Sequence, residues 1–237
     1  MLPRTTLPHL RPAPTAAAQR TRGPAPPAVR PVYAAKAWFD LSCAALLFVG
    51  TLPLMVLTCL AVRLTSTGPA IYSQSRVGRA GRVFTIYKFR TMAHNCELAS
   101  GIQWSVRGDS RITPLGHWLR KLHLDELPQL VNVLRGEMSL VGPRPERPEI
   151  VADLQLSIVN YDVRHTVLPG ITGFAQVHLP PDSSILTVKN KLIYDRFYIS
   201  RLGLRMDIYC LACTLLKVVG LKKLYQRSPR RPAGIDE

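Results

Sequence analysis

The chain has 237 residues, a length typical of one domain, and its 31 Lys and Arg residues outnumber its 15 Asp and Glu residues. The resulting net charge of +16 favours an anionic partner. Three kinds of partner fit this charge: nucleic acid, a membrane surface and a phosphorylated substrate. Of the five cysteines, only Cys210 and Cys213 have metal-ligand spacing and no second pair accompanies them, which argues against a zinc site and a disulfide framework.

Both ends of the chain are predicted to be loose tails. Residues 1–31 are rich in Pro, Ala and Arg and show no apolar periodicity, so they cannot bury enough surface to offset the entropy lost on ordering. They also lack the form of a signal peptide, because the apolar run comes late and no small-residue cleavage site follows it. Residues 225–237 are predicted to be a second flexible tail.

Residues 32–64 contain the most apolar segment of the chain. Between Asp40 and Arg63 lie 22 residues without a charged side chain, enough to cross the hydrocarbon layer of a membrane as an ordinary transmembrane helix. However, both flanks are basic, so the positive-inside rule gives no orientation, and Pro53 interrupts the helical hydrogen bonds. The alternative is a re-entrant helix that breaks at Leu52-Pro53 and returns to the same face of the membrane, which removes both conflicts.

Residues 65–224 are predicted to form one domain of the α+β class, mostly helical. β-prone pieces flank a Gly- and Arg-rich turn, and apolar residues later recur at intervals of three and four. The predicted elements, in chain order, are a hairpin or extended ribbon within 69–92, a loop at 93–110, helices at 115–122 and 127–134, a helical stretch near 148–162, the turn-rich LPGITGFAQV, and a long helix or helix pair from about 184 to 222.

The stretch LHLDELPQL places Asp125 and Glu126 side by side among leucines. Because Pro128 is tolerated only in a first helical turn, one helix is expected to end by Leu124 and another to begin around Asp125. On this interpretation Asp125 is an N-cap, where free amides and the helix dipole stabilise negative charge. The alternative is catalytic: adjacent carboxylates can hold Mg²⁺ against a phosphate and one can attack phosphorus, provided that basic residues neutralise the phosphate oxygens. Such residues are near in the sequence, namely Arg111, Arg120, Lys121, Arg135 and Arg144.

Six motifs in chain order resemble those of the bacterial sugar transferases, the monotopic phosphoglycosyl transferases. They are Lys36 and Asp40 before the apolar helix, TGPAIYSQSRVG, FTIYKFRTM, the block DSRITPLGHWLRKLHLDELPQLVNVLRGEMSLVGPRPERPE, LPGITGFAQV, and KLIYDRFYISRLGLRMDI. Together they span about residues 33–220. A lone Asp-Glu-Leu-Pro would be weak evidence, whereas six ordered motifs are specific.

The resemblance implies an enzyme on the cytoplasmic face of the bacterial inner membrane, with a re-entrant helix at 32–64 and a catalytic domain at 65–224. Its members transfer a sugar 1-phosphate from a nucleotide-sugar, usually a UDP-sugar, to polyprenyl (undecaprenyl) phosphate and release UMP, which initiates exopolysaccharide, capsule, O-antigen or glycan synthesis. The expected cofactor is Mg²⁺, and the expected partners beyond the two substrates are membrane lipid, a second copy of the chain and downstream glycosyltransferases.

The resemblance also assigns roles to residues. The acid matching Asp125 attacks the sugar-bearing phosphate and forms a covalent phosphosugar intermediate, and Glu126 assists with Mg²⁺ or orientation, so both acids are expected metal ligands. Phosphate contacts are expected from Arg120, Arg144, Arg111, Lys88 and Arg90, and positioning roles from Lys36, Asp40, Pro169, Gly170, Thr172 and Gly173.

Three positions depart from the family pattern. Leu52 stands where Ser often precedes the proline, Leu168 stands where a basic residue often precedes PGITG, and HLPPDSS stands where Asn-Gly often follows AQV. The first concerns the helix break, and the other two concern the sugar pocket.

Two other functions are compatible with parts of the pattern. One is a membrane-anchored, Mg²⁺-dependent hydrolase of nucleotide-sugars or lipid diphosphates that uses the same acids. The other is a non-catalytic basic adaptor at a membrane or on nucleic acid. Nucleic acid is not an expected partner, because the chain has neither a nucleic-acid motif nor an interleaved aromatic platform.

Overall fold

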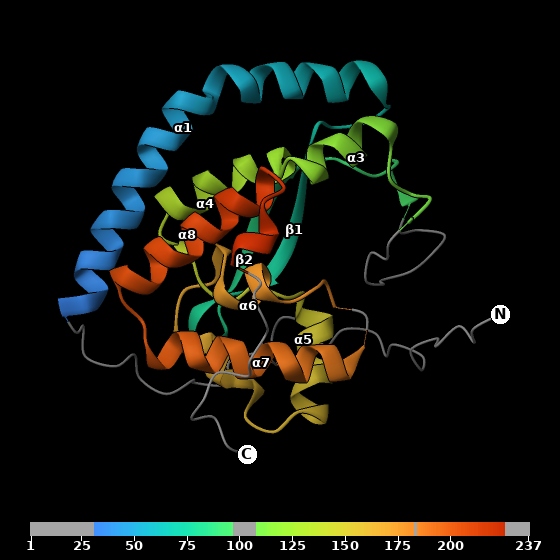
Figure 1. Ribbon diagram of the computed structural model, residues 1–237. Helices are drawn as coiled ribbons and strands as arrows, with labels where there is room; N and C mark the ends of the chain where they lie inside the picture. The colour runs from blue at the N-terminus through green and yellow to red at the C-terminus, as the bar shows by residue number, and fades with distance from the viewer. Residues whose placement is uncertain (1–30, 97–107, 183, 226–237) are drawn as a thin grey trace.

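The computed structural model describes residues 31–96, 108–182 and 184–225 (Figure 1). Nearly all of the two predicted tails and most of the predicted loop at 93–110 lie outside these residues. The elements are α1 (Pro31–Thr65), β1 (Ile71–Val77), η1 (Arg79–Gly81), β2 (Val83–Phe89), α3 (Pro114–Lys121), η2 (Leu124–Gln129), α4 (Leu130–Leu134), β3 (Ser139–Val141), α5 (Pro148–Ser157), η3 (Tyr161–Thr166), β4 (Gly170–Thr172), α6 (Phe174–His178), α7 (Ile185–Ser200), α8 (Leu204–Val218) and η4 (Lys222–Leu224), where η denotes a 3-10 helix.

Helix α1 arches over the rest of the protein as two limbs that meet at a bend (Figure 1). Pro53 lies inside this helix and supplies no backbone N–H, which removes one hydrogen bond at that level. The Thr51 and Thr58 hydroxyls donate to the carbonyls of Leu47 and Leu54 at 2.7 and 2.8 Å, a type of contact that favours helix bending. The hydroxyls that bond to the backbone on either side of Pro53 therefore come from threonines rather than from a serine before the proline.

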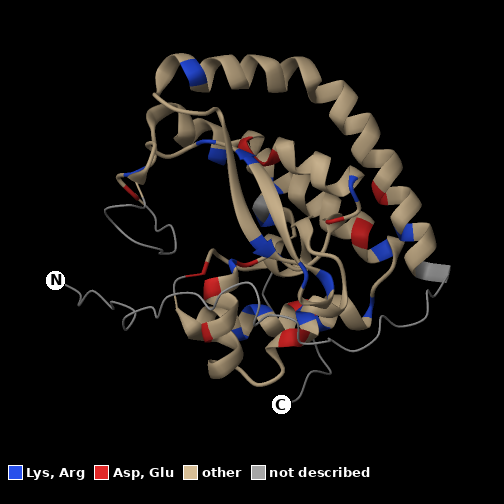
Figure 2. Ribbon diagram, turned by 180° about the vertical axis from the view of Figure 1, so that it is seen from behind, with Lys and Arg blue, Asp and Glu red and all other residues tan. Residues whose placement is uncertain are grey.

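The outer face of α1 is apolar and exposed over most of its length. Leu46, Val49 and Leu57 are 75%, 70% and 63% exposed. Between Asp40 and Arg63 the helix has no charged residue, and Figure 2 shows a long stretch of α1 without Lys, Arg, Asp or Glu. The helix is long and apolar enough to cross a membrane by length and composition.

Both limbs of α1 pack against the same domain. Ala44, in the first limb, belongs to a core cluster with Leu130 of α4 and Tyr198 of α7. Val62, in the second limb, packs with Phe89 of β2 and Leu119 of α3. The buried positions of α1 recur at helical spacing along its concave face, which explains how one helix follows a curved surface.

A buried ionic network fixes the first limb. Lys36 is 2.7 Å from Asp207 of α8 and 3.5 Å from Asp40, and it donates to the Val141 carbonyl at 3.1 Å. Tyr198 donates to Asp207 at 2.7 Å and to the same Val141 carbonyl at 2.9 Å. The network joins α1, α7 and α8 to strand β3, which leads directly into the Gly-Pro-Arg-Pro segment.

The predicted hairpin is confirmed. Strands β1 and β2 pair antiparallel from Ile71↔Phe89 to Val77↔Val83, and Ala80 adopts a left-handed conformation in the connecting turn. The predicted helical region at 184–222 is a pair, α7 and α8, rather than one helix. A capping box between Ser184 and Thr187 begins α7.

The chain around the acidic pair differs from the sequence prediction. Helix α3 begins at a Thr113 cap, whose hydroxyl accepts from the Gly116 amide at 3.0 Å, and ends at Lys121 as expected. The next segment is not an α-helix beginning at Asp125. It is the 3-10 helix η2, preceded by His123 in a left-handed conformation, and α4 follows it. The first of the two interpretations, in which Asp125 is a helix N-cap, is therefore wrong, because Asp125 lies within the first turn of η2.

A parallel strand pair connects two distant motifs. β3 pairs with β4 at Ser139↔Gly170 and Val141↔Thr172, which brings VGPRP beside LPGITG. The backbones touch closely: a Cβ on Gly173 would lie 2.1 Å from the Gly142 carbonyl oxygen, and one on Gly170 would lie 2.0 Å from the Gly142 nitrogen. Only glycine fits at these positions.

Candidate functional site

The Glu126 carboxylate is held by two cations from distant parts of the chain. Lys88 of β2 donates to Glu126 Oε1 at 2.8 Å, and Arg144 donates to the same oxygen at 3.3 Å. Burial alone would raise the pKa of Glu126, but the charges of Lys88 and Arg144 outweigh burial and hold the pKa far below its ordinary value. Glu126 is therefore ionised at neutral pH, with its charge already neutralised by protein.

The neighbouring Asp125 carboxylate is in a different state. Asp125 is 8% exposed, yet within the described ranges its carboxylate makes neither a hydrogen bond nor an ion pair. Burial raises the pKa of Asp125 and the adjacent Glu126 charge adds to the rise, while Lys88 and Arg120 oppose it. An unpaired, poorly solvated carboxylate is more nucleophilic than one held by hydrogen bonds. The pair therefore consists of one anchored and one free acid.

The tight backbone of η2 produces this difference. His123 has φ 56°, a left-handed value that is uncommon outside glycine, and it turns the chain sharply after α3. Pro128 fits within η2, and Gln129 begins the transition to α4 with its side chain buried. Strand β2 packs along η2, which is how Lys88 comes to reach Glu126.

Arg144 is presented by the connection after β3. Its guanidinium lies between Glu126 Oε1 and Gln176 Oε1, with Nη1 3.3 Å from each. The Glu126 charge raises the pKa of Arg144, so this residue stays protonated. Its side chain is 39% exposed, which leaves part of the guanidinium accessible to a ligand.

The other predicted phosphate ligands have different surroundings. Arg120 Nε donates to the Thr91 hydroxyl at 2.8 Å, and its charge acts on Asp125. Arg111 makes a two-nitrogen ion pair with Asp109, at 2.9 and 2.6 Å. Arg90 donates to the backbone of Ser66 and Pro69, so its guanidinium holds the end of α1. The structure thus brings Lys88, Arg120 and Arg144 together around the two acids, and gives Arg90 a structural role.

The charge balance of this cluster is positive. The cations Lys88, Arg120 and Arg144 surround the two acids, with His123 close to both. Burial lowers the pKa of His123, which keeps its ring neutral at neutral pH. The cluster therefore has spare positive charge for an anionic ligand such as a phosphate.

The donor set suits Mg²⁺ only when a substrate completes it. In the described portion of the chain, no group of three or more His, Cys, Asp or Glu residues is placed to hold a metal ion. Asp125 and Glu126 provide two carboxylates, and the Asp125 oxygens are uncommitted. Mg²⁺ is commonly bound by one or two carboxylates together with phosphate oxygens and water, so the residues fit this mode of binding.

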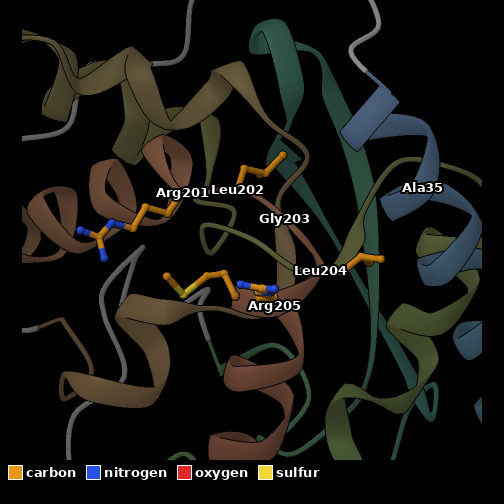
Figure 3. A pocket seen from close by; sticks show the side chains of 7 residues that line it. Ala35, Arg201, Leu202, Gly203, Leu204 and Arg205 are labelled. Carbon is orange, nitrogen blue, oxygen red and sulfur yellow. The ribbon is translucent and has the colours of Figure 1, made fainter.

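A separate pocket lies at the turn between α7 and α8. It has a volume of about 390 Å³ and is lined by Ala35 of α1 and by residues 201–206, whose side chains Figure 3 shows. None of the acids or cations of the cluster lines this pocket. It is therefore distinct from the candidate site.

Comparison with known proteins places this geometry in a family. Residues 32–221 match the family model of the bacterial sugar transferases. The chain belongs to the bacterial sugar transferase family. The match includes all of α1 except Pro31, both acids and every cation of the cluster, which agrees with the resemblance seen in the sequence motifs.

Two curated relatives contain the matching region within longer chains. The UDP-glucose:undecaprenyl-phosphate glucose-1-phosphate transferase of Xanthomonas campestris pv. campestris is 40% identical over 193 residues, which are 81% of this chain and 40% of the relative. The UDP-N-acetylgalactosamine-undecaprenyl-phosphate N-acetylgalactosaminephosphotransferase of Aeromonas hydrophila is 40% identical over 190 residues, which are 80% and 45% of the two chains. This chain thus spans less than half the length of either relative.

A relative of similar length also exists. An uncharacterized sugar transferase of Bacillus subtilis strain 168 is 37% identical over 185 residues, which are 78% of this chain and 87% of the relative. The relatives named for a substrate differ in the sugar, glucose in one and N-acetylgalactosamine in the other, at equal identity to this chain. Overall similarity therefore does not select the sugar.

Sequence reasoning missed several members of the site. Gln176 contacts Arg144, and Asn132, fully buried, donates to the Thr85 carbonyl and accepts from the Tyr87 amide, which ties α4 to β2. These residues are uncharged polar side chains within otherwise apolar motifs. That buried polar character was the available signal, but it gave no indication of the partner.

Proposed function

We propose that the protein transfers a sugar 1-phosphate from a UDP-sugar to polyprenyl phosphate, and that Asp125 forms a covalent phosphosugar intermediate. The observation that carries this proposal is the asymmetry of the acid pair. Glu126 is neutralised by Lys88 and Arg144, whereas the buried Asp125 carboxylate is free to act as a nucleophile. The names of the curated relatives support the same donor and acceptor classes.

In the first step, an Asp125 carboxylate oxygen attacks the sugar-bearing phosphorus of the donor. A bond forms between this oxygen and phosphorus, and the bond to the oxygen that bridges the two phosphates breaks, which releases UMP. The nucleophile is already an anion, so no general base is needed. Arg144 and Arg120 stabilise the charge that develops on the phosphate oxygens and on the departing UMP.

In the second step, a phosphate oxygen of polyprenyl phosphate attacks the same phosphorus. The bond between phosphorus and Asp125 breaks, the carboxylate is regenerated, and polyprenyl-diphosphate-sugar is formed. This nucleophile is also an anion, so the second step again requires no proton transfer. One buried acid therefore serves both half-reactions.

Glu126 organises the cations rather than reacting. Its single oxygen Oε1 holds both the Lys88 ammonium and the Arg144 guanidinium, so it fixes two positive groups beside Asp125. Mg²⁺, when bound, would be held by Asp125 and Glu126 and would supply further charge neutralisation to the donor phosphates.

We further propose that α1 is re-entrant and that the acids lie just above the cytoplasmic face of the membrane. The two limbs of α1 pack on one folded domain, through Ala44 in the first limb and Val62 in the second. A straight transmembrane helix would place its ends on opposite sides of the bilayer, which is incompatible with both sets of contacts. A shallow bent helix lets a lipid acceptor reach a site in the domain.

The proposal is tested by following UMP release with and without a lipid acceptor. Purified protein in nanodiscs, mixed with a panel of UDP-sugars, should release about one equivalent of UMP and then stop. Mass spectrometry should show a phosphosugar adduct on the peptide that contains Asp125. Addition of undecaprenyl phosphate should restart turnover. A hydrolase would instead release UMP continuously without the acceptor.

Asp125→Asn is the decisive variant. It should abolish both the burst of UMP and the adduct, yet leave the unfolding temperature unchanged or higher, because it removes a buried charge that has no partner. The matched control is Asp153→Asn, an exposed acid on α5, which should behave as wild type. Activity of Asp125→Asn within tenfold of wild type would eliminate Asp125 as the nucleophile.

A further inference from the structure

The segment that presents Arg144 has an unusual hydrogen-bonding problem. Pro143 and Pro145 flank Arg144, and neither has an N–H group, so the segment cannot extend the β3–β4 ladder on its own. The carbonyls nevertheless need donors, because buried carbonyls without partners are costly. This raises the question of which groups hold the loop in place.

Each carbonyl from 143 to 146 receives a donor from elsewhere in the chain. The Gly170 amide donates to the Pro143 carbonyl at 2.9 Å, and the Val77 amide donates to the Glu146 carbonyl at 2.9 Å. The two carbonyls between them accept from side chains: Arg164 donates to the Arg144 carbonyl at 3.0 Å, and Arg76 donates to the Pro145 carbonyl at 3.1 Å. Two guanidinium groups thus replace the missing backbone donors.

Arg164 is the more deeply embedded of the two arginines. Its side chain is 6% exposed, and it contacts three groups at once: the Tyr161 hydroxyl at 2.6 Å, the Asp195 carboxylate at 3.0 Å and the Arg144 carbonyl. Asp195, on α7, is itself 4% exposed on its side chain. A planar guanidinium can serve three partners in fixed directions, whereas a lysine ammonium on its flexible stem cannot match this fork.

These contacts indicate an indirect role for Arg164. Both of its Nη atoms contact protein groups, and its side chain is shielded from solvent, so it does not reach a phosphate. What it touches is the backbone of the residue whose guanidinium contacts Glu126. A displacement of that backbone would move the Arg144 side chain relative to Asp125, and displacements of about 1 Å are enough to reduce catalysis strongly.

We propose that Arg164, oriented by Asp195 and Tyr161, is a positioning residue that holds Arg144 at the nucleophile. This inference rests on the proposed function only in its expected effect on the rate of UMP release. The structural part, a loop fixed from behind by a buried guanidinium, concerns the chain itself. Arg164 and Arg144 therefore form one functional unit, although only Arg144 meets the substrate.

A double-mutant cycle tests the coupling. Arg164→Lys keeps the charge opposite Asp195 but loses the fork, and it should lower kcat/KM for UMP release, followed in single turnover, by about tenfold. In an Arg144→Ala background the same change should cost less than about twofold, because Arg164 acts through Arg144. Losses that multiply in the double variant would overturn the proposal.

A second, smaller substitution keeps the test valid if Arg164→Lys fails to fold. Tyr161→Phe removes one hydrogen bond of Arg164 and keeps the ring, and it should show a smaller loss with the same dependence on Arg144. The matched control is Asp153→Asn, which removes the charge of an exposed acid on α5 without touching the loop or the partners of Arg164. Its effect on activity should be small and should not depend on Arg144.

Amide hydrogen exchange reads out the loop without any reaction. The Val77 N–H donates to the Glu146 carbonyl, so its exchange reports whether the loop stays closed. Arg164→Lys and Tyr161→Phe should speed this exchange severalfold, whereas Asp153→Asn should not. Unchanged Val77 exchange in both variants would overturn the positioning role. If wild-type protein releases no UMP from any UDP-sugar, the proposed function fails while this test still stands.

Discussion

The close approach of Gly173 to Gly142 provides a steric test of how Arg144 is positioned. Gly173 has an extended backbone, with φ −175° and ψ 165°, so alanine is conformationally acceptable there. The only obstacle is space, since a Cβ would lie 2.1 Å from the Gly142 carbonyl oxygen, against 3.4 Å or more for ordinary contact. Gly173→Ala must therefore push the two backbones apart by about 1 Å or more, next to the residue that precedes Pro143-Arg144.

A shift of this size predicts a large kinetic effect. Misplacement of a catalytic group by about 1 Å costs on the order of 100-fold in rate. Gly173→Ala should therefore lower kcat/KM for UMP release by about that factor, measured on protein whose far-UV circular dichroism matches wild type. The unfolding temperature should also fall, by an amount set by overpacking of about 1–3 kcal/mol.

Gly203→Ala is the matched control for this experiment. Gly203 is also extended, with φ 168°, and a Cβ there would meet only the Arg201 carbonyl at 4.0 Å. Its activity and stability should stay close to wild type. If Gly173→Ala is folded and fully active, the contact between Gly142 and Gly173 does not set the position of Arg144, and the reasoning from the β3–β4 pair fails.

Three further predictions concern charge and topology. The pKa of Asp125 is raised above the ordinary 3.8, so as the pH falls this residue should lose its reactive carboxylate form at a higher pH than a solvated acid would. Lys88→Met removes a charge that lowers this pKa, so it should move the acid limb of the kcat/KM profile to higher pH. An acid limb that does not move would contradict this prediction. Lys36→Met should destabilise the protein by about 3–5 kcal/mol in denaturant titrations, because it strands a fully buried Asp207, and adding Asp207→Asn should recover part of the loss. Replacing Leu52-Pro53 by Ala-Leu gives an uninterrupted apolar helix of about 33 Å, and should expose a cysteine placed near residue 25 of a cysteine-free variant to external labelling. Unchanged topology in that variant would show that contacts such as Lys36 with Asp207, rather than the proline, turn the chain.

Local sequence patterns predicted much of this protein. The 22 uncharged residues and Pro53 predicted an apolar helix with a break, and β-prone pieces on both sides of the turn at residues 79–82 predicted the hairpin, because both signals are local in the sequence. The six motifs predicted the family, which residues 32–221 confirm. The acids at 125 and 126 were identified as a pair, since adjacency is visible in the sequence itself.

Tertiary structure alone decided how the two acids differ. Asp125 and Glu126 have the same local sequence, yet Lys88 and Arg144 both reach Glu126 and leave Asp125 unpaired. The sequence also suggested a capping role for Asp125, but the left-handed turn at His123 places it within η2 instead. Secondary-structure propensity depends on residues that are close in the sequence, whereas ion pairs depend on where distant segments pack.

The partners of the basic residues were likewise not predictable from the local sequence. The resemblance assigned phosphate contacts to both Lys88 and Arg90. Lys88, within β2, reaches Glu126, whereas Arg90 follows the end of β2 and donates to the backbone of Ser66 and Pro69. The packing of η3 against α7 brings Arg164, distant in the sequence, to the Arg144 carbonyl. The sequence determined which charges are present. The long-range contacts determined which of them remain available for chemistry, because each buried cation bonds to the nearest acceptors that the folded backbone supplies.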